Sequence, residues 1–371
     1  MNAMRSRQDL MADFLAAAGW GAADQRPLPG DASTRRYVRL HLHGRTAMLM
    51  DQPQDVETAT APATATPTER KALGYNAIAR LAGADCGRFI AAADYLRQCG
   101  LKAPEIYASD VGHGFLLIED LGPHLYTDIL DRGGSESELY AAAIDALVAL
   151  HEAPAPATLR PDKPLFPYDE AALLAETELL TDWFFPLAIG RRADPGESEE
   201  HRALWRRVLK TLDSGASVFV HRDYHAQNLM WRDGLSGVAR VGIIDFQDAV
   251  SGSPAYDVVS LLEDARRDVS PELCERMTSR YLERSPCTAA AADRAHFRAC
   301  AAVLAAQRNV KIAGIFARLA RRDGKTRYLA HIPRVWRYLE RDLRHDVLTP
   351  LRQWYDTLVP AGARNQGVTQ A

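Results

Sequence analysis

Two polar segments, each directly behind a short apolar run, constrain this chain more than any other feature. The run from Val218 to Val220 leads into the segment HRDYHAQN at residues 221–228, and the run from Val241 to Ile244 leads into Asp245. A third short run extends from Asn228 to Trp231. Short apolar runs bounded by turn residues are typical of buried strands. The sequence therefore predicts two polar loops held by strands, with Asp245 at the exposed end of its strand.

Three side chains in these loops, Asp223, Asn228 and Asp245, indicate one kind of chemistry. An H-R-D-x-x-x-x-N segment followed by D-F is the pattern of kinase catalytic and metal-binding loops. In phosphoryl transfer a carboxylate accepts the proton of the attacking hydroxyl, while a carboxamide oxygen and a second carboxylate hold Mg²⁺ on the phosphates. We therefore expect Asp223 to be the catalytic base, and Asn228 and Asp245 to be the Mg²⁺ ligands. The alternative, that these residues only cap turns, leaves the joint occurrence of both runs and both motifs unexplained.

The order of apolar patterns along the chain predicts two lobes. Strand-like runs separated by turns dominate before residue 120, whereas helical spacing of apolar residues dominates after it. We expect an α+β, bilobal protein-kinase-like fold, with a small β-rich N-terminal nucleotide-binding lobe at residues 1–120 and a larger α-rich C-terminal catalytic lobe at residues 121–371. The expected strands of the first lobe lie at residues 37–42, 45–50, 105–109 and 114–119, and its main helix at residues 88–98.

One segment of the N-terminal lobe has no pattern of a regular element. From Asp55 to Glu69 the sequence is Ala, Thr and Pro in near alternation. Such a composition buries little apolar area and offers no helical stripe. We expect a mobile loop at about residues 54–70.

Composition and charge argue against several classes of protein. The chain has a net charge of −3, which gives no general attraction to nucleic acid or to an anionic membrane. Its five cysteines stand singly, so neither a zinc site nor a disulfide framework is expected. Asp9 and Asp13 interrupt the apolar residues of the first segment, which have helical spacing, and no apolar run approaches the ~18 residues of a membrane-spanning helix. We expect a cytoplasmic protein without a nucleic-acid or membrane partner.

The C-terminal part is locally basic. Between Arg308 and Arg344 there are eleven Lys and Arg residues against three acidic ones. Such a run is either a solvated helical surface or a site for an anionic ligand or partner. The sequence leaves both interpretations open.

The segment that begins at Asp245 carries a family resemblance. It reads DFQDAVSGSPAYD at residues 245–257 and so ends in a Pro-x-x-Asp motif. In this respect the chain resembles the aminoglycoside phosphotransferase and choline kinase superfamily rather than protein kinases, whose A-P-E segment it lacks. The resemblance implies that Asp257 is a buried anchor that hydrogen-bonds the catalytic loop, and that His221 fixes the backbone geometry of that loop. His225 is either a reagent or, more simply, a side chain that orients the loop.

Four further segments resemble one branch of that superfamily, the anomeric kinases of cell-wall recycling. Members of this branch phosphorylate N-acetylmuramate and N-acetylglucosamine at the C1 hydroxyl. The resemblance implies an ATP- and Mg²⁺-dependent sugar kinase of peptidoglycan recycling, and it extends through most of the chain. The segments are residues 30–37 (GDASTRRY), 50–53 (MDQP), 114–122 (GFLLIEDLG) and 307–316 (QRNVKIAGIF).

The chain departs from the general kinase pattern where the nucleotide phosphates should bind. The expected lysine is replaced by Met50, and the helix at residues 88–98 has no glutamate to pair with such a lysine. Loss of both partners together is coherent, because a lone buried charge is costly. We expect Arg35 or Arg36, on the turn that includes Ser33, to reach the phosphates instead. The alternative is that both arginines are exposed residues at a strand edge.

The resemblance also implies where adenine binds. Glu119, Asp120 and Leu121 follow the last strand of the β-rich lobe and precede Gly122. We expect them to be the connector between the lobes, with the base bonded to their backbone.

A candidate acceptor site follows from the branch resemblance. Arg308 and Lys311 are three residues apart, so they share one face of a helix. Either is a candidate to hold the lactyl carboxylate of N-acetylmuramate beside Asp223. The alternative is that both side chains extend past the apolar stripe into solvent.

Three other functions stay open at this point. The same chemistry on another small alcohol, such as an aminoglycoside, choline or homoserine, is one alternative. A nucleotide-binding pseudokinase is another, and Met50 in place of the lysine favours it. A nucleic-acid-binding role for the basic segment is the weakest, because its aromatic residues have the spacing of core-facing helices.

Overall fold

A computed structural model describes residues 5–30, 34–53 and 60–365 of the chain. The chain forms two compact units, each built from several segments. We call them the sheet unit (residues 1–134, 157–165 and 227–249) and the helical unit (residues 135–156, 166–226 and 250–371). A single boundary at residue 120 does not describe this division, because the strands next to Asn228 and Asp245 fold with the sheet unit.

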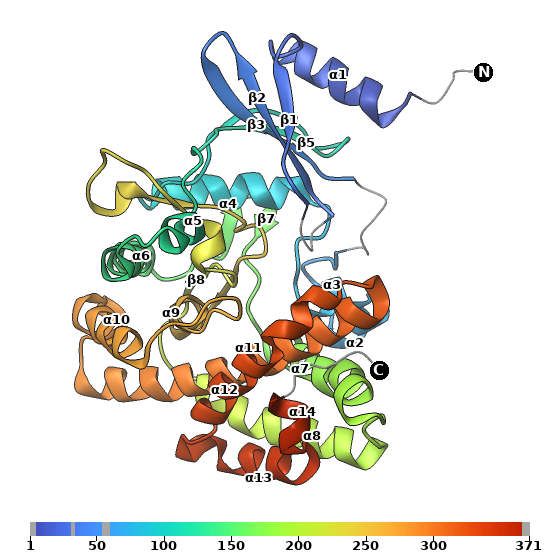
Figure 1. Cartoon of the computed structure of the whole chain (residues 1–371), viewed down its shortest axis with the longest axis vertical. Coiled ribbons are helices and arrows are strands. Elements are labelled where there is room, and N and C mark those ends of the chain that lie inside the picture. The colour runs from blue at the N-terminus through green and yellow to red at the C-terminus, as the bar shows by residue number, and fades with distance from the viewer. Residues whose placement is uncertain (1–4, 31–33, 54–59, 366–371) are drawn as a thin grey trace. The chain divides into compact units, whose positions relative to one another are not determined.

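The sheet unit is built on a five-stranded antiparallel sheet in the order β1-β2-β3-β5-β4 (Figure 1). His43 and Gly44, both with positive φ (49° and 76°), join β2 to β3 in the two-residue turn that hairpins favour. The predicted strand pairs are confirmed. We did not predict β1, because its sequence DQRP has no apolar alternation. The strands are β1 (Asp24–Pro27), β2 (Arg36–Leu42), β3 (Arg45–Asp51), β4 (Ile106–Asp110) and β5 (Phe115–Ile118).

Helix α1 (Arg7–Ala17) covers one face of this sheet (Figure 1). Its apolar residues Phe14 and Leu15 are buried in one cluster with Leu40 of β2 and Leu49 of β3. This is the helix that the spacing of the first apolar residues predicted. Burial of these side chains is the main force that holds α1 on the sheet.

The expected loop is shorter than predicted. Residues 54–59 lie outside the described part, and α2 (Pro67–Leu73) begins inside the segment that we expected to be irregular. Thr66 accepts a hydrogen bond from the Glu69 N–H, and the Glu69 carboxylate accepts one from the Thr66 N–H, which completes a capping box. The local cap, followed by a proline at the first helical position, starts a helix that apolar periodicity does not reveal.

A second, two-stranded sheet in this unit positions Asn228 and Asp245. Strands β9 (Leu229–Trp231) and β10 (Val241–Ile243) pair antiparallel, and Gly242 of β10 bridges to Lys102. Both strands match the predicted apolar runs to within one residue. The remaining elements of the unit are α3 (Tyr75–Ile78), α4 (Cys86–Gln98), α5 (Tyr126–Asp131), β6 (Thr158–Arg160) and β7 (Lys163–Pro164).

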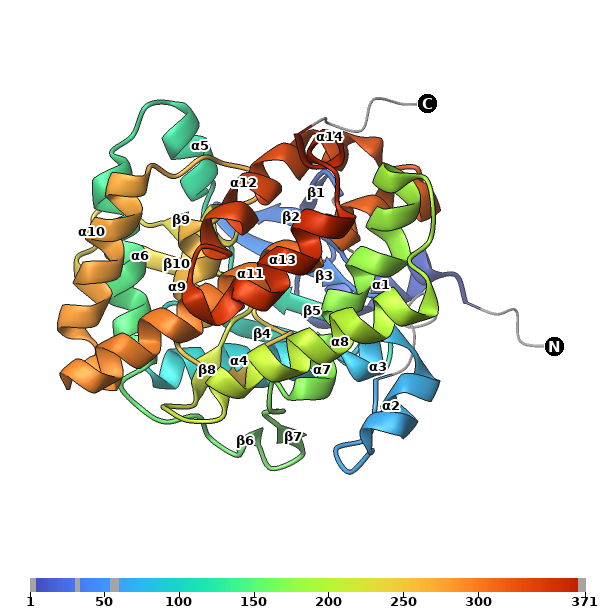
Figure 2. The same ribbon diagram turned by 90° about the horizontal axis from the view of Figure 1, so that it is seen from below.

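The helical unit is organised around the long helix α11 (Ala291–Asp323), which packs against α7, α9 and α12 (Figure 2). A Cβ atom on Gly314 would lie 2.4 Å from the backbone carbon of Leu179, so only glycine allows this close approach. The helices are α6 (Glu136–Leu150), α7 (Glu170–Leu179), the π-helix η1 (Leu180–Ile189), α8 (Pro195–Leu209), α9 (Ala255–Leu262), α10 (Pro271–Arg284), α11, α12 (Ile332–Asp342), α13 (Thr349–Leu358) and α14 (Ala361–Asn365).

The segment that begins at His221 directly follows a short strand of this unit. Strand β8 (Val218–Val220) pairs antiparallel with β11 (Val250–Gly252), and β8 has the bounds that the sequence predicted. Its three residues are fully or almost fully buried, which anchors the loop that follows. In the part of the chain that is described, no helix combines the length and apolar character that crossing a bilayer requires.

Candidate active site

The backbone of the predicted catalytic loop is held by one buried carboxylate on α9. Asp257 accepts hydrogen bonds from the N–H groups of His221 (2.7 Å) and Arg222 (2.9 Å). His221 in turn accepts a bond at Nδ1 from the Asp223 N–H (3.2 Å). Burial raises the pKa of Asp257 to about 6, although both backbone donors favour the ionised form. These contacts are the ones that the family resemblance implied for Asp257.

The Asp223 carboxyl group lies in a mostly cationic environment within the helical unit. Burial raises its pKa, but the neighbouring positive charges, with Lys311 first, more than offset this and hold the pKa below the ordinary value. The group is therefore ionised at neutral pH, as a general base must be. The other cationic or titratable neighbours are His221, Arg222 and His225.

His225 is buried on the same loop. Its N–H donates to the Asp223 carbonyl oxygen (3.1 Å), and burial lowers the pKa of its imidazole. This backbone contact fits the simpler interpretation of a residue that orients the loop.

Glu176 on α7 is a residue of this loop environment that the sequence analysis did not single out. Its side chain is fully buried and binds the Arg222 guanidinium and the Lys311 ammonium, the latter at 2.9 Å. It also accepts hydrogen bonds from the Tyr168 hydroxyl and, at 2.9 Å, from Gln307 Nε2. Burial raises the pKa of Glu176, but these cations and hydrogen bonds keep it below the ordinary value.

A signal for Glu176 exists in the sequence. It stands three residues after Leu173 and four before Leu180, so it lies on the apolar face of its helix. An acidic residue on such a face is almost never buried without a partner. The sequence could not name the partners, because Arg222 and Lys311 are distant along the chain.

The two cations of α11 have different partners. Lys311 meets Glu176 and lies 3.5 Å from the Tyr256 hydroxyl, whereas Arg308 donates from Nη1 to the Glu263 carbonyl oxygen (3.0 Å). The alternative that both extend into solvent is wrong, because Arg308 is 5% exposed and the Lys311 side chain 12%. The sequence suggested that one of these cations binds the carboxylate of a ligand. In the structure, Lys311 instead binds a carboxylate of the protein, Glu176.

The sheet unit brings Asn228 and Asp245 to the same end of the β9–β10 hairpin. The last paired residues are Leu229 and Ile243, and just beyond them the Ile244 N–H donates to the Asn228 carbonyl oxygen (3.1 Å). Asp245 has a positive φ of 62°, which turns its side chain off the strand direction. A carboxylate and a carboxamide are the hard oxygen ligands that Mg²⁺ prefers, with phosphates and waters completing its coordination. The donor set therefore fits a nucleotide-bound Mg²⁺, and the described residues contain no cluster of three His, Cys, Asp or Glu that would suit a transition metal better.

Arg35, and not Arg36, is directed toward Asp245. Its Nη1 lies 2.9 Å from Asp245 Oδ1, and Gln247 Nε2 donates to the same oxygen (3.1 Å). Arg36 is exposed on β2, and Ser33 lies outside the described residues. The pairing distinguishes two arginines that the sequence treated as equivalent.

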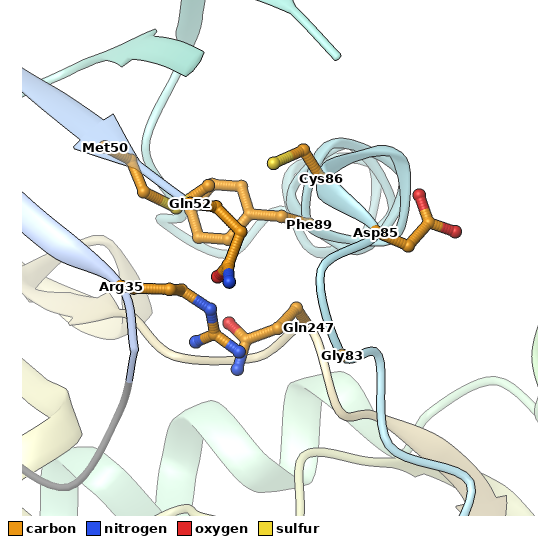
Figure 3. Close-up of a pocket in the computed structure, with 8 residues that line it drawn as sticks. All are labelled: Arg35, Met50, Gln52, Gly83, Asp85, Cys86, Phe89 and Gln247. Carbon is orange, nitrogen blue, oxygen red and sulfur yellow. The ribbon is translucent and has the colours of Figure 1, made fainter. Parts of the chain in front are cut away.

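Figure 3 shows the cavity beside Arg35, with Gln247 on one side and Met50 and Phe89 on another. The cavity has a volume of about 10 Å³, and Met50, at the expected lysine position, is buried in its wall. The side chain of Cys86 from α4 also lines it. An apolar Met50 opposite an apolar helix face is the arrangement that loss of both charged partners predicts.

The predicted connector residues are held by ion pairs within the sheet unit. Glu119 binds Lys102 (2.6 Å) and Asp120 binds Arg39 (2.8 Å). The Leu121 side chain approaches Gly242 of β10 so closely that a Cβ there would lie 3.0 Å from it. Two of the three side chains are therefore occupied, and the Glu119 N–H also donates to the Glu105 carbonyl oxygen (2.8 Å).

Much of the basic charge at the C-terminal end is neutralised within the helical unit. Arg334 and Arg337 both bind Asp268, at 2.8 and 2.7 Å, and Arg341 binds Glu263 at 2.6 Å. These pairs favour the interpretation of this segment as a helical surface over that of a site for an anionic partner.

Known proteins resemble this chain over nearly its whole length. A Caulobacter vibrioides protein named N-acetylmuramate/N-acetylglucosamine kinase is 43% identical over 367 residues, covering 98% of this chain and 100% of that protein. A Pseudomonas aeruginosa protein of the same name is 33% identical over 340 residues, covering 88% of this chain and 87% of that protein.

The fold is also shared with a solved kinase. The structure of a microcompartment-associated aminopropanol kinase superimposes with a TM-score of 0.57 at 15% identity, covering 90% of this chain and 98% of that one. The α+β protein-kinase-like fold, with a β-rich N-terminal part and a mostly helical C-terminal part, is thereby confirmed. The family model described as "Phosphotransferase enzyme family" matches residues 24–294, a span that contains both strand-held loops. With this match and the 43% identity to a full-length relative, the chain belongs to the phosphotransferase enzyme family.

Proposed function

We propose that this protein is an ATP- and Mg²⁺-dependent kinase that phosphorylates the anomeric C1 hydroxyl of N-acetylmuramate and N-acetylglucosamine. The observation that carries the proposal is the 43% identity over 98% of the chain to a protein named for both sugars. The catalytic loop supports it, because Asp223 is partly buried, is ionised, and is fixed by hydrogen bonds of its backbone. A pseudokinase has no need of a base prepared in this way.

In this reaction Asp223 accepts the proton of the sugar C1 hydroxyl as its oxygen attacks the γ-phosphorus of ATP. A new oxygen–phosphorus bond forms, and the bond from the γ-phosphorus to the bridging oxygen breaks to release ADP. Asn228 and Asp245 would hold Mg²⁺, which neutralises charge on the phosphates. His221 and Asp257 act by holding the Asp223 backbone in place.

The nucleotide is proposed to bind on the sheet unit. Arg35 supplies the cation that Met50 cannot. Its guanidinium would pair with a phosphate in place of Asp245 once that carboxylate holds Mg²⁺. Adenine bonds to backbone groups of the connector at Glu119, Asp120 and Leu121. The ion pairs of Glu119 and Asp120 support this arrangement by fixing the connector through its side chains.

The acceptor is proposed to bind beside Asp223 on the helical unit. Of the two cations suggested from the sequence, Lys311 is the one that belongs to the environment of Asp223. The contact of Arg308 with the Glu263 carbonyl oxygen argues for a structural role of that side chain.

A phosphate-transfer assay over a panel of amino sugars, aminoglycosides and amino alcohols tests the proposal. We expect ADP release to depend on N-acetylmuramate or N-acetylglucosamine, and ³¹P–¹H NMR of the product to place the phosphate on C1. Transfer to an amino alcohol or an aminoglycoside alone would identify a different acceptor. Nucleotide binding without transfer to any compound would support the pseudokinase alternative.

A further inference from the structure

Glu176 is a buried carboxylate to which the reaction proposed above gives no role. It is fully buried on α7, yet it binds two cations from different elements, Arg222 of the catalytic loop and Lys311 of α11. Tyr168 and Gln307 donate to it as well, so its oxygen atoms are saturated by four side chains. This is a built network and not an incidental surface pair.

Such a network is costly for packing alone. Burying several charges loses their hydration, and an apolar core of similar volume is often equally stable or more so. Since α7 and α11 already pack closely at Gly314 and Leu179, the charges are not needed to join the helices. The role of the network therefore lies in the positions of Arg222 and Lys311, which it fixes.

The network connects Lys311 to the residue next to the catalytic base. Arg222 precedes Asp223 directly, and its backbone N–H is fixed by Asp257 while its side chain is fixed by Glu176. Lys311 is bound to that same Glu176 carboxylate at 2.9 Å. One buried anion thus sets the position of a cation relative to the loop that carries Asp223.

We infer that Glu176 is a positioning residue that holds Lys311 beside Asp223, and that Lys311 keeps this base ionised for each turnover. The inference rests on the proposed function, in which Asp223 accepts the proton of the acceptor. The charges of Glu176, Asp223, Arg222 and Lys311 sum to zero when the base is ionised.

The other charged and titratable groups near Asp223 support this assignment. Lys311 is the strongest of the charges that lower the pKa of Asp223, which burial raises. Asp257 acts in the opposite direction, since the two carboxylates repel each other. The groups that face Asp223 in the helical unit are Lys311, His225, Arg222, His221 and Asp257.

This role differs from recognition of the lactyl carboxylate. The charge of Lys311 is paired with Glu176 at 2.9 Å and is the largest of the charges that lower the pKa of Asp223. N-acetylglucosamine has no carboxylate, so a cation that serves the base promotes transfer to both sugars equally. The two roles therefore predict different substrate dependence for the same substitution.

The experiment measures kcat and kcat/KM against pH for both sugars in Lys311→Met, Lys311→Arg and Glu176→Gln. Removing a neighbouring opposite charge raises a carboxyl pKa by about 1–3 units. Activity depends on ionised Asp223. In Lys311→Met, the acid limb of the pH–activity profile, where activity falls with decreasing pH, should therefore move to higher pH by about that amount for both sugars. Lys311→Arg should restore the limb. Glu176→Gln releases Lys311 from its position and should move the limb up by less than Lys311→Met does, whereas a downward shift, the effect of removing an anion alone, would overturn the positioning role. Two variants serve as matched controls: Glu178→Gln on α7, whose partner is Arg202, and Lys210→Met at an exposed lysine of the same unit.

An unchanged acid limb in Lys311→Met would overturn the inference, as would a loss confined to N-acetylmuramate, which would assign Lys311 to the carboxylate instead. A ¹³C-carboxyl NMR titration of Asp223 in the wild type, Lys311→Met and Glu176→Gln gives a second measurement that needs no turnover. If the wild type transfers phosphate to neither sugar, the proposed function fails, and this titration still decides the inference. Should Lys311→Met not fold, Glu176→Gln, which keeps the size of the side chain, carries the test through its upward shift.

Discussion

Each of the two loops of this protein has an arginine–carboxylate pair, and the pairs differ in burial. In the sheet unit, Arg35 meets Asp245 with side-chain exposures of 9% and 40%. In the helical unit, Arg222 meets Glu176 with exposures of 1% and 0%. The chemistry of the two pairs is the same, so the difference in exposure decides what each is able to do.

A partly exposed pair exchanges partners readily. Water and ions compete for the Asp245 carboxylate, and such pairs typically contribute only about 0–1 kcal/mol to stability. A fully buried pair has no such competitor, and removal of one member leaves an unpaired charge without water. The Arg35 pair therefore suits a site that must receive a metal and a nucleotide, whereas the Glu176 pair suits a loop that must keep one geometry.

The substitution Asp223→Asn should distinguish the functions of the two units most clearly. We expect turnover to fall by about 10²–10⁴-fold, because the positioned base is lost, while nucleotide binding on the sheet unit stays near the wild-type value. Steady-state kinetics together with calorimetric titration of ADP measure the two effects separately. A variant that keeps more than half of the wild-type kcat, with chemistry rate-limiting, would remove Asp223 from the role of base.

The stability of the two pairs is compared directly by Glu176→Ala and Arg35→Ala. The first should lower the free energy of unfolding by about 3–5 kcal/mol, since Arg222 and Lys311 lose their buried partner. The second should lower it by only about 0–1 kcal/mol. Chemical denaturation followed by circular dichroism provides both values, with Glu178→Ala as the control on α7. Equal losses for the two variants would contradict the comparison.

Metal dependence tests the proposed exchange at the sheet unit. Asp245→Ala should abolish productive use of Mg²⁺·ATP, because the charged ligand is removed. Asn228→Ala should weaken the Mg²⁺ titration of activity less, since a neutral ligand is lost. A Mg²⁺ titration that is unchanged in Asp245→Ala would show that the metal binds elsewhere.

The smallest effect is expected for the phosphate cation. Arg35→Ala should raise the KM for ATP on the order of tenfold, the equivalent of about 1.4 kcal/mol. Arg36→Ala is the matched control, because that side chain is exposed on β2, and its KM should stay at the wild-type value. The same rise in both variants would mean that general electrostatic attraction, and not the position of Arg35, binds the phosphates.

Local patterns in the sequence were sufficient to predict the strands that hold both loops. Apolar runs bounded by turn residues predicted β8, β9 and β10, since a run of this length has few ways to be buried. The H-R-D and D-F motifs then indicated Asp223, Asn228 and Asp245 as candidate site residues from their spacing. Elements with a purely local cause but no apolar pattern were missed, as the capping box that starts α2 shows.

Partners that are distant along the chain required the tertiary structure. Glu176 and Arg222 are 46 residues apart, and Arg35 and Asp245 are 210 apart. The sequence determined that the lysine expected at Met50 is absent, but only folding decided that Arg35, and not Arg36, faces Asp245. The same holds for Lys311. The sequence shows that it is a cation, but only the packing of α7 on α11 shows that its partner is Glu176. The physical reason is that charge acts through space, and over such separations it is the packed fold that decides which charges meet.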